Sequence, residues 1–100
     1  MVLVIGSVTV RADAVEEALG LCQRHVDRSR QEAGCIRHGV HVDNEDACRL
    51  VFVEYWQDIE HLEEHFRIPE SLDFVKRLGT LATSAPEMEL FRSSPLAWPP

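Results

Sequence analysis

The sequence predicts an α+β domain over residues 1–93, with a four-stranded antiparallel sheet and helices on one face. Three observations predict it. The chain opens with a run rich in β-branched residues, in which both the odd- and the even-numbered positions are largely apolar. A helical stripe follows, and then two alternating segments are separated by a short polar turn. Together they give the element order βαββαβ.

The first strand is expected over residues 2–11. Val2 and Val4 lie on one parity of this run, while Leu3 and Ile5 lie on the other. Because successive strand side chains point to opposite faces, both faces of this strand are expected to be covered.

The first helix is expected to begin at Asp13, which stands at an N-cap position with Glu16 three residues later. Gly34 is expected to end it as a C′ glycine. Its apolar residues recur at helical spacing and form one stripe: Val15, Ala18, Leu19, Cys22 and Val26.

Residues 35–42 and 48–56 alternate as strands and form a hairpin around the polar turn 43–46. Asp58 is then expected to cap a short helix over 59–66, and Pro69 to open another helix at its first turn. A final strand is expected over 88–92. The proline-rich tail, residues 94–100, is expected to stay outside the sheet.

This order is that of the ferredoxin-like fold. The first and third strands carry apolar residues on both parities, so the sheet face away from the helices needs cover as well. We expect a second copy of the chain to supply it, giving a homodimer through the sheet faces.

The bulk composition narrows the possible partners. The formal net charge of the 100 residues is −7, and the ten basic residues are scattered, so nucleic acid and anionic membranes are not expected partners. Three cysteines without a C-x-x-C pair indicate reduced thiols. No signal peptide is recognisable in the first residues, and a cytoplasmic location is expected.

One short motif suggests zinc chemistry. Residues 61–65 read H-x-x-E-H, and His61 and His65 share one side of a helix. However, no second motif supplies a third ligand, and Ile59, Leu62 and Phe66 make this an ordinary amphipathic helix. His65 falls at the edge of the apolar stripe and His61 towards solvent, so no metal site is expected.

In their order and spacing, several short motifs resemble the antibiotic biosynthesis monooxygenase (ABM) family over about residues 2–92. They are Glu32-Ala-Gly-Cys35, Glu54-Tyr-Trp56, the helix ending in His65, and Phe74. The resemblance implies a dimeric α/β barrel of ferredoxin-like subunits. It also implies oxygenation of phenols, anthrones or quinols by O2 without metal, flavin or haem.

The resemblance implies His65 and Trp56 as catalytic residues and Glu54 and His41 as substrate-binding residues. A histidine suits the proton step because its ordinary pKa is about 6.5, and an indole can donate a hydrogen bond to oxygen. Two aromatic residues complete the expected pocket: Phe52 on the same strand face as Glu54, and Phe74 from the following helix.

Each of these residues also has a structural reading. His65 could fix its helix, Trp56 could be a core aromatic, and Glu54 could pair with an arginine at the dimer interface. His38 competes with His41 because it shares the apolar parity of its strand. His25 is expected to be structural.

Two departures from the family matter. The Asn, Trp and His used by haem-degrading relatives are not reproduced, so haem degradation is not expected. The Asn and Tyr of quinone-forming members are also missing near the hairpin, where Phe52 and Leu62 stand. The alternative to the monooxygenase is therefore a non-catalytic dimeric barrel that binds a small aromatic ligand or acts in a stress response.

Overall fold

The computed structural model describes all 100 residues and confirms the element order βαββαβ. The second helical segment is split in two by Ile68, which has extended backbone. The elements are β1 (Val2–Thr9), a 3₁₀ turn (Ala12–Ala14), α1 (Val15–Ser29), β2 (Cys35–Asp43), β3 (Asp46–Trp56), α2 (Ile59–Arg67), α3 (Pro69–Leu81) and β4 (Glu87–Arg92).

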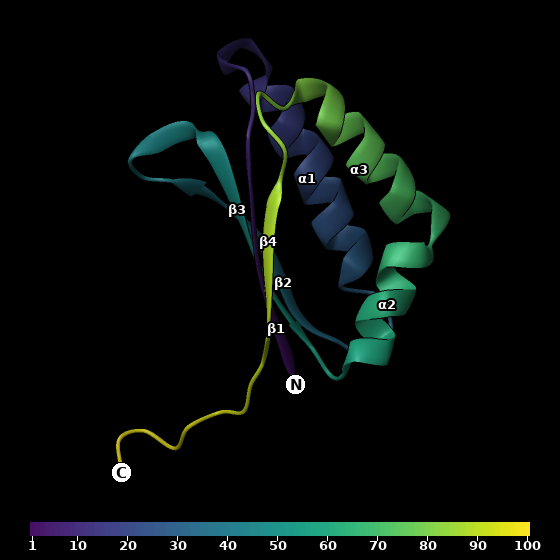
Figure 1. Cartoon of the computed structure of the whole chain (residues 1–100), viewed down its shortest axis with the longest axis vertical. Coiled ribbons are helices and arrows are strands. Elements are labelled where there is room, and N and C mark those ends of the chain that lie inside the picture. The colour runs from purple at the N-terminus through teal and green to yellow at the C-terminus, as the bar shows by residue number, and fades with distance from the viewer.

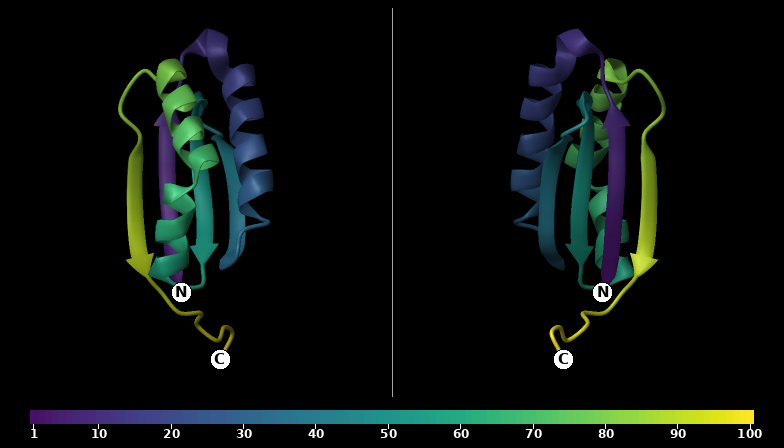
Figure 2. Two further views of the ribbon diagram at one scale, coloured as in Figure 1. Left: turned by 90° about the vertical axis from the view of Figure 1, so that its right-hand side faces the viewer. Right: turned by 90° about the vertical axis from the view of Figure 1, so that its left-hand side faces the viewer.

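The four strands form one antiparallel sheet in the order β2-β3-β1-β4, which is the ferredoxin-like order. All three helices cover the same face of this sheet (Figure 1). The opposite face carries no helix (Figure 2). No helix is both long enough and apolar enough to cross a membrane.

The uncovered sheet face has an apolar centre, as the two-sided pattern of the first strand predicts, with charged residues such as Arg37, Arg49 and Glu89 around it. Leu3 of β1 pairs with Tyr55 of β3 and Phe91 of β4. Two residues further along β1, Ile5 pairs with Val53 of β3. In the single chain the side chains from β1 and β3 are only partly buried, and Phe91 is exposed.

The core under the helices has two apolar parts. The larger one lies between the sheet and helices α1 and α3, and the smaller one contains Trp56 and Leu62. The His38 ring centroid lies 6.1 Å from that of Phe52 in the larger part and 6.2 Å from that of Trp56 in the smaller. Polar side chains therefore separate the two parts.

Two predicted helix signals turn out to be wrong. Asp13 does not cap α1, because its carboxylate binds Arg11 instead and the helix begins at Val15 without a side-chain cap. Gly34 does not end α1 either, since the helix stops at Ser29. Gly34 has a φ of 83° and turns the chain into β2.

The start of α2 is capped as predicted, since Asp58 accepts a hydrogen bond from the His61 amide. Pro69 stands in the first turn of α3. The residues after β4 form neither helix nor strand, and Leu96 and Trp98 are 84% and 78% exposed.

Candidate functional site

A cavity of about 230 Å³ lies between the sheet and helices α2 and α3, beside β4. Aromatic and aliphatic side chains form most of its wall, including Phe52, Phe66, Phe74, Leu78 and Met88. The polar groups reaching it include His25, Glu54, His65 and Ser71. An apolar pocket with a few convergent polar groups is the usual form of a small-molecule site.

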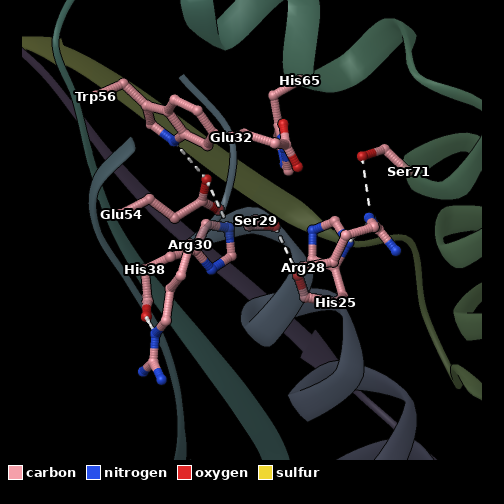
Figure 3. A network of polar contacts seen from close by, with 10 residues as sticks. All are labelled: His25, Arg28, Ser29, Arg30, Glu32, His38, Glu54, Trp56, His65 and Ser71. Carbon is pink, nitrogen blue, oxygen red and sulfur yellow. Dashed lines mark hydrogen bonds and ion pairs between the residues drawn. The ribbon is translucent and has the colours of Figure 1, made fainter. Parts of the chain in front are cut away.

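His65 reaches the cavity from α2, and its orientation is fixed by Glu32. Its Nδ1 lies 2.8 Å from Glu32 Oε1, on the segment that joins α1 to β2 (Figure 3). Because a carboxylate only accepts, Nδ1 carries the proton and the Nε2 lone pair is left free. His65 therefore presents an acceptor, and a potential base, to the cavity.

Burial lowers the pKa of His65 below its ordinary value, although the Glu32 carboxylate acts in the opposite direction. The imidazole is consequently neutral near pH 7. A neutral imidazole with a free Nε2 is the form that can accept a proton.

His25 reaches the same cavity from α1 with the opposite tautomer. Arg28 Nη2 lies 2.6 Å from His25 Nδ1, and a guanidinium can only donate. Nδ1 therefore accepts, so the ring proton is on Nε2. The ring is stacked on Phe74, with centroids 3.9 Å apart and planes at 8°.

The pKa of His25 is lowered to about 2, first by burial and then by the nearby His65, His38 and Arg28. His25 thus stays neutral across the working pH range. Its Nε2–H is therefore a fixed donor. The centroid of the His25 ring lies 5.1 Å from that of the His65 ring.

Glu54 is held from two sides. Trp56 Nε1 donates to Glu54 Oε1 at 2.9 Å, and His38 Nε2 lies 3.1 Å from the same oxygen. Burial raises the pKa of Glu54, but the contacts with His38 and Trp56 outweigh it and leave the pKa below its ordinary value. Glu54 is therefore a buried carboxylate at the cavity.

The structure brings four of the predicted site residues to the cavity: His65, Glu54, Phe52 and Phe74. Trp56 is fully buried behind them and does not line it. Its only polar hydrogen is used on Glu54, so the prediction that the indole faces the reacting oxygen needs correction. Trp56 orients Glu54 instead.

The prediction that His41 lies at the pocket is wrong as well. It pairs with Val51 on the uncovered sheet face and is exposed, so it lies on the opposite side of the sheet from the cavity. His38 occupies the helix-covered face, as its shared parity with Val40 and Val42 indicated. His25 was missed as a site residue, although it falls seven residues after Ala18 on the apolar stripe of α1.

The H-x-x-E-H pair does not converge. His61 Nδ1 binds Asp58 Oδ1 at 2.6 Å, and its ring lies against Gly34 rather than in solvent as expected. A Cβ at Gly34 would collide with that ring. The segment Glu32–Cys35 thus holds α2 at two points, through Glu32 on His65 and through Gly34 under His61.

The fold and the cavity define a small α+β protein with a mainly apolar pocket that opens to the surface and has histidines at its polar end. The sequence profile named antibiotic biosynthesis monooxygenase matches residues 1–77. The chain therefore belongs to the antibiotic biosynthesis monooxygenase family, which confirms the resemblance read from its motifs.

Three comparisons describe its relatives. Uncharacterized protein sll1783 of Synechocystis sp. is 29% identical over 91 residues, which are 91% of this chain. The aligned part spans 62% of that protein. A crystal structure of an antibiotic biosynthesis monooxygenase is 25% identical with a TM-score of 0.89, covering 95% of this chain and 100% of the other.

A third relative, a crystal structure from Deinococcus radiodurans, reaches a TM-score of 0.91 at 19% identity. The match covers 97% of this chain and 96% of the other. That protein is named a putative antibiotic biosynthesis monooxygenase. These likenesses confirm the ferredoxin-like α+β fold.

Proposed function

We propose that this protein is a cofactor-independent monooxygenase that oxidises a small electron-rich aromatic, such as a quinol, phenol or anthrone, with O2 to a quinone. The observation that carries the proposal is the pair of histidines at one apolar cavity. His65 presents a free Nε2 and His25 presents an Nε2–H, each fixed by a partner on Nδ1.

The size of the cavity favours the smaller substrates. A cavity of roughly 150 Å³ holds one benzene ring. The 230 Å³ of this cavity therefore suits one substituted ring or two fused rings better than the three rings of an anthrone.

The first step assigned to the protein is removal of the phenolic proton by His65 Nε2. Glu32 stabilises the imidazolium that forms, because its carboxylate accepts the Nδ1–H. The resulting phenolate is electron-rich enough to give an electron to O2 and to form a C–O bond at a ring carbon.

The imidazolium of His65 then returns its proton to the peroxide, which becomes a hydroperoxide. The neutral imidazole removes the proton of the same ring carbon, the O–O bond breaks, and one oxygen stays as the new carbonyl. The other oxygen leaves as hydroxide and takes the proton from His65 to become water. A phenol and one O2 thus give a quinone and one H2O, and the substrate supplies all four electrons. His25 Nε2–H donates to the substrate oxygen while it carries negative charge.

We further propose that the protein works as a homodimer whose subunits meet through the uncovered sheet face. Leu3, Val53 and Phe91 give this face an apolar centre that a second copy would cover. Light scattering should then give a mass of two chains.

The enzyme assay is oxygen uptake with a panel of one- and two-ring quinols and phenols. We expect uptake above autoxidation for the wild type and for Glu64→Gln, an exposed position on the same helix as His65. His65→Gln should reduce kcat/KM by roughly a hundredfold and His25→Gln by tenfold or more. Autoxidation-level uptake with every substrate, together with quinol binding, would support the non-catalytic alternative instead.

A further inference from the structure

Three buried histidines from three different elements converge at the polar end of the cavity, which two of them line. His25 comes from α1, His38 from β2 and His65 from α2 (Figure 3). One ring nitrogen of each lies within 4.8 Å of those of the other two. This trio is distinct from the H-x-x-E-H pair, because His61 takes no part in it.

The ring positions match those of a metal centre. With a metal–nitrogen distance of about 2.0–2.1 Å and tetrahedral angles, the ring centroids of three imidazole ligands lie about 5 Å apart. The observed centroid separations are 5.1 Å, 5.4 Å and 5.6 Å. The three rings therefore have the spacing of three ligands of one ion, and binding requires their nitrogens to turn towards a common point.

A second observation points to a ligand at this place. His38 is almost fully buried, yet neither of its ring nitrogens has a hydrogen-bond partner. Its Nε2 is 3.1 Å from Glu54 Oε1, a contact that is an ion pair only if the ring is protonated, and its Nδ1 has no partner. Buried polar groups normally have partners, and an ion bound between His38 and Glu54 would provide one for His38.

The surroundings also suit a cation. Glu54 supplies a fourth ligand, and Glu32 holds the Nδ1–H of His65 as outer carboxylates do for zinc-binding histidines. The carboxylates of Glu54 and Glu32 balance the charge of a divalent ion.

Arg28 is the group that opposes binding. It donates to His25 Nδ1 and so keeps the proton on Nε2, and it adds a positive charge. Its other hydrogen bond is a 3.3 Å contact with Ser71 Oγ, and its Nε has no partner. For an ion to bind, the guanidinium must turn away and the His25 proton must move to Nδ1.

We propose that His25, His38, His65 and Glu54 form a binding site for a divalent transition-metal ion of the zinc type, and that Arg28 sets its affinity. Imidazole and carboxylate ligands in a tetrahedral arrangement suit Zn²⁺ and Co²⁺. The ion takes the Nε2 lone pair that the proposed oxidation uses, so ion and substrate exclude each other. The site itself does not depend on that function.

The test is a titration of tag-free, chelator-treated protein with Co²⁺, followed by visible absorption, and then displacement by Zn²⁺. We expect one Co²⁺ per chain with the intense bands of a tetrahedral complex. His38→Asn should weaken binding by about a hundredfold, and Arg28→Gln should tighten it by about tenfold because one repelling charge is gone. His41→Gln, on the opposite face, should bind as the wild type does.

Equal binding by the wild type and His38→Asn, or a weak octahedral spectrum, would overturn the site. Should His38→Asn fail to fold, imidazole ¹H–¹⁵N spectra of the wild type decide the matter. Zn²⁺ should then shift His25, His38 and His65 while His41 and His61 stay in place, and the reverse pattern refutes the proposal. Neither readout uses oxygen uptake, so failure here is distinguishable from failure of the proposed oxidation.

Discussion

Glu32 and His65 lie 33 residues apart in the chain, yet their side chains meet at 2.8 Å and fix which nitrogen of the histidine faces the cavity. We predict that Glu32→Gln lowers kcat/KM by roughly a hundredfold, because the imidazolium formed at His65 loses its carboxylate partner.

The pH profile separates this role from simple support of the fold. Since Glu32 raises the pKa of His65, its loss should move the acidic limb of the kcat/KM profile to lower pH. Glu64→Gln should leave the profile in place, and an unmoved limb in Glu32→Gln would show that Glu32 does not act through His65.

Protein stability should decrease in mild acid because His25 is buried in its neutral form. Its folded pKa is about 2, whereas the unfolded chain binds a proton near pH 6.5. Its contribution is complete above about pH 6.5 and falls by up to about 1.4 kcal/mol for each pH unit below that. Urea unfolding at pH 7.5, 6.0 and 5.0 measures this slope.

His65, whose pKa is also lowered, adds to the loss in the same direction. Glu54 acts in that direction only below its ordinary pKa. His25→Gln should therefore give a shallower slope than the wild type, and an identical slope contradicts the assignment to His25.

Gly34→Ala should destabilise the fold by about 1–3 kcal/mol, because Gly34 combines a positive φ with a ring directly above it. His61→Ala removes the collision but leaves the φ, so the double variant should recover part of the lost free energy of unfolding. Urea unfolding of the four proteins of this cycle measures the coupling. Strictly additive effects would mean that the ring and the glycine do not interact.

The three thiols should differ in reactivity. Burial raises the pKa of the Cys22 thiol to about 12, and burial together with Glu54 and Glu32 raises that of Cys35. Cys48 is partly exposed. With iodoacetamide at pH 8, mass spectrometry should find Cys48 alkylated first and Cys22 only after unfolding. Early labelling of Cys22 would mean that α1 opens readily in the native state.

Val53→Asp should convert a two-chain assembly into monomers, because it places a charge at the centre of the uncovered sheet face. Leu72→Asp makes the same change at an exposed position on α3 and should leave the mass unchanged. Light scattering of both variants gives the answer, and a dimeric Val53→Asp places the interface elsewhere.

Local patterns predicted the fold well, because the apolar residues of each element recur at the spacing of a helix or of a strand. The alternation of Val2 to Thr9, the cap at Asp58 and Pro69 in the first turn all appear as expected. The two signals that failed did so for different reasons. Arg11, only two residues away, takes the carboxylate of Asp13. The helix α1 ends at Ser29, before the chain reaches Gly34.

The site was predictable only in part, because a sequence pattern gives the side of an element on which a residue lies but not the partner of its polar atoms. Parity and helical spacing place His38 and His65 inward. They cannot show that Trp56 donates its indole N–H to Glu54, or that Arg28 selects the tautomer of His25. Both contacts join residues close together in the chain, but they depend on side-chain rotamers that the tertiary packing sets and that no sequence pattern specifies.

The division of the cavity between elements has a consequence for how its specificity could evolve. The histidines and Glu54 come from α1, α2 and β3, whereas much of the apolar wall comes from α3 and β4 through Phe74, Leu78 and Met88. Substitutions in that wall can enlarge or reshape the space without disturbing the Glu32–His65 contact. Phe74 is stacked on the His25 ring, so Leu78 and Met88 are the positions at which the substrate range can change with the least effect on the reaction.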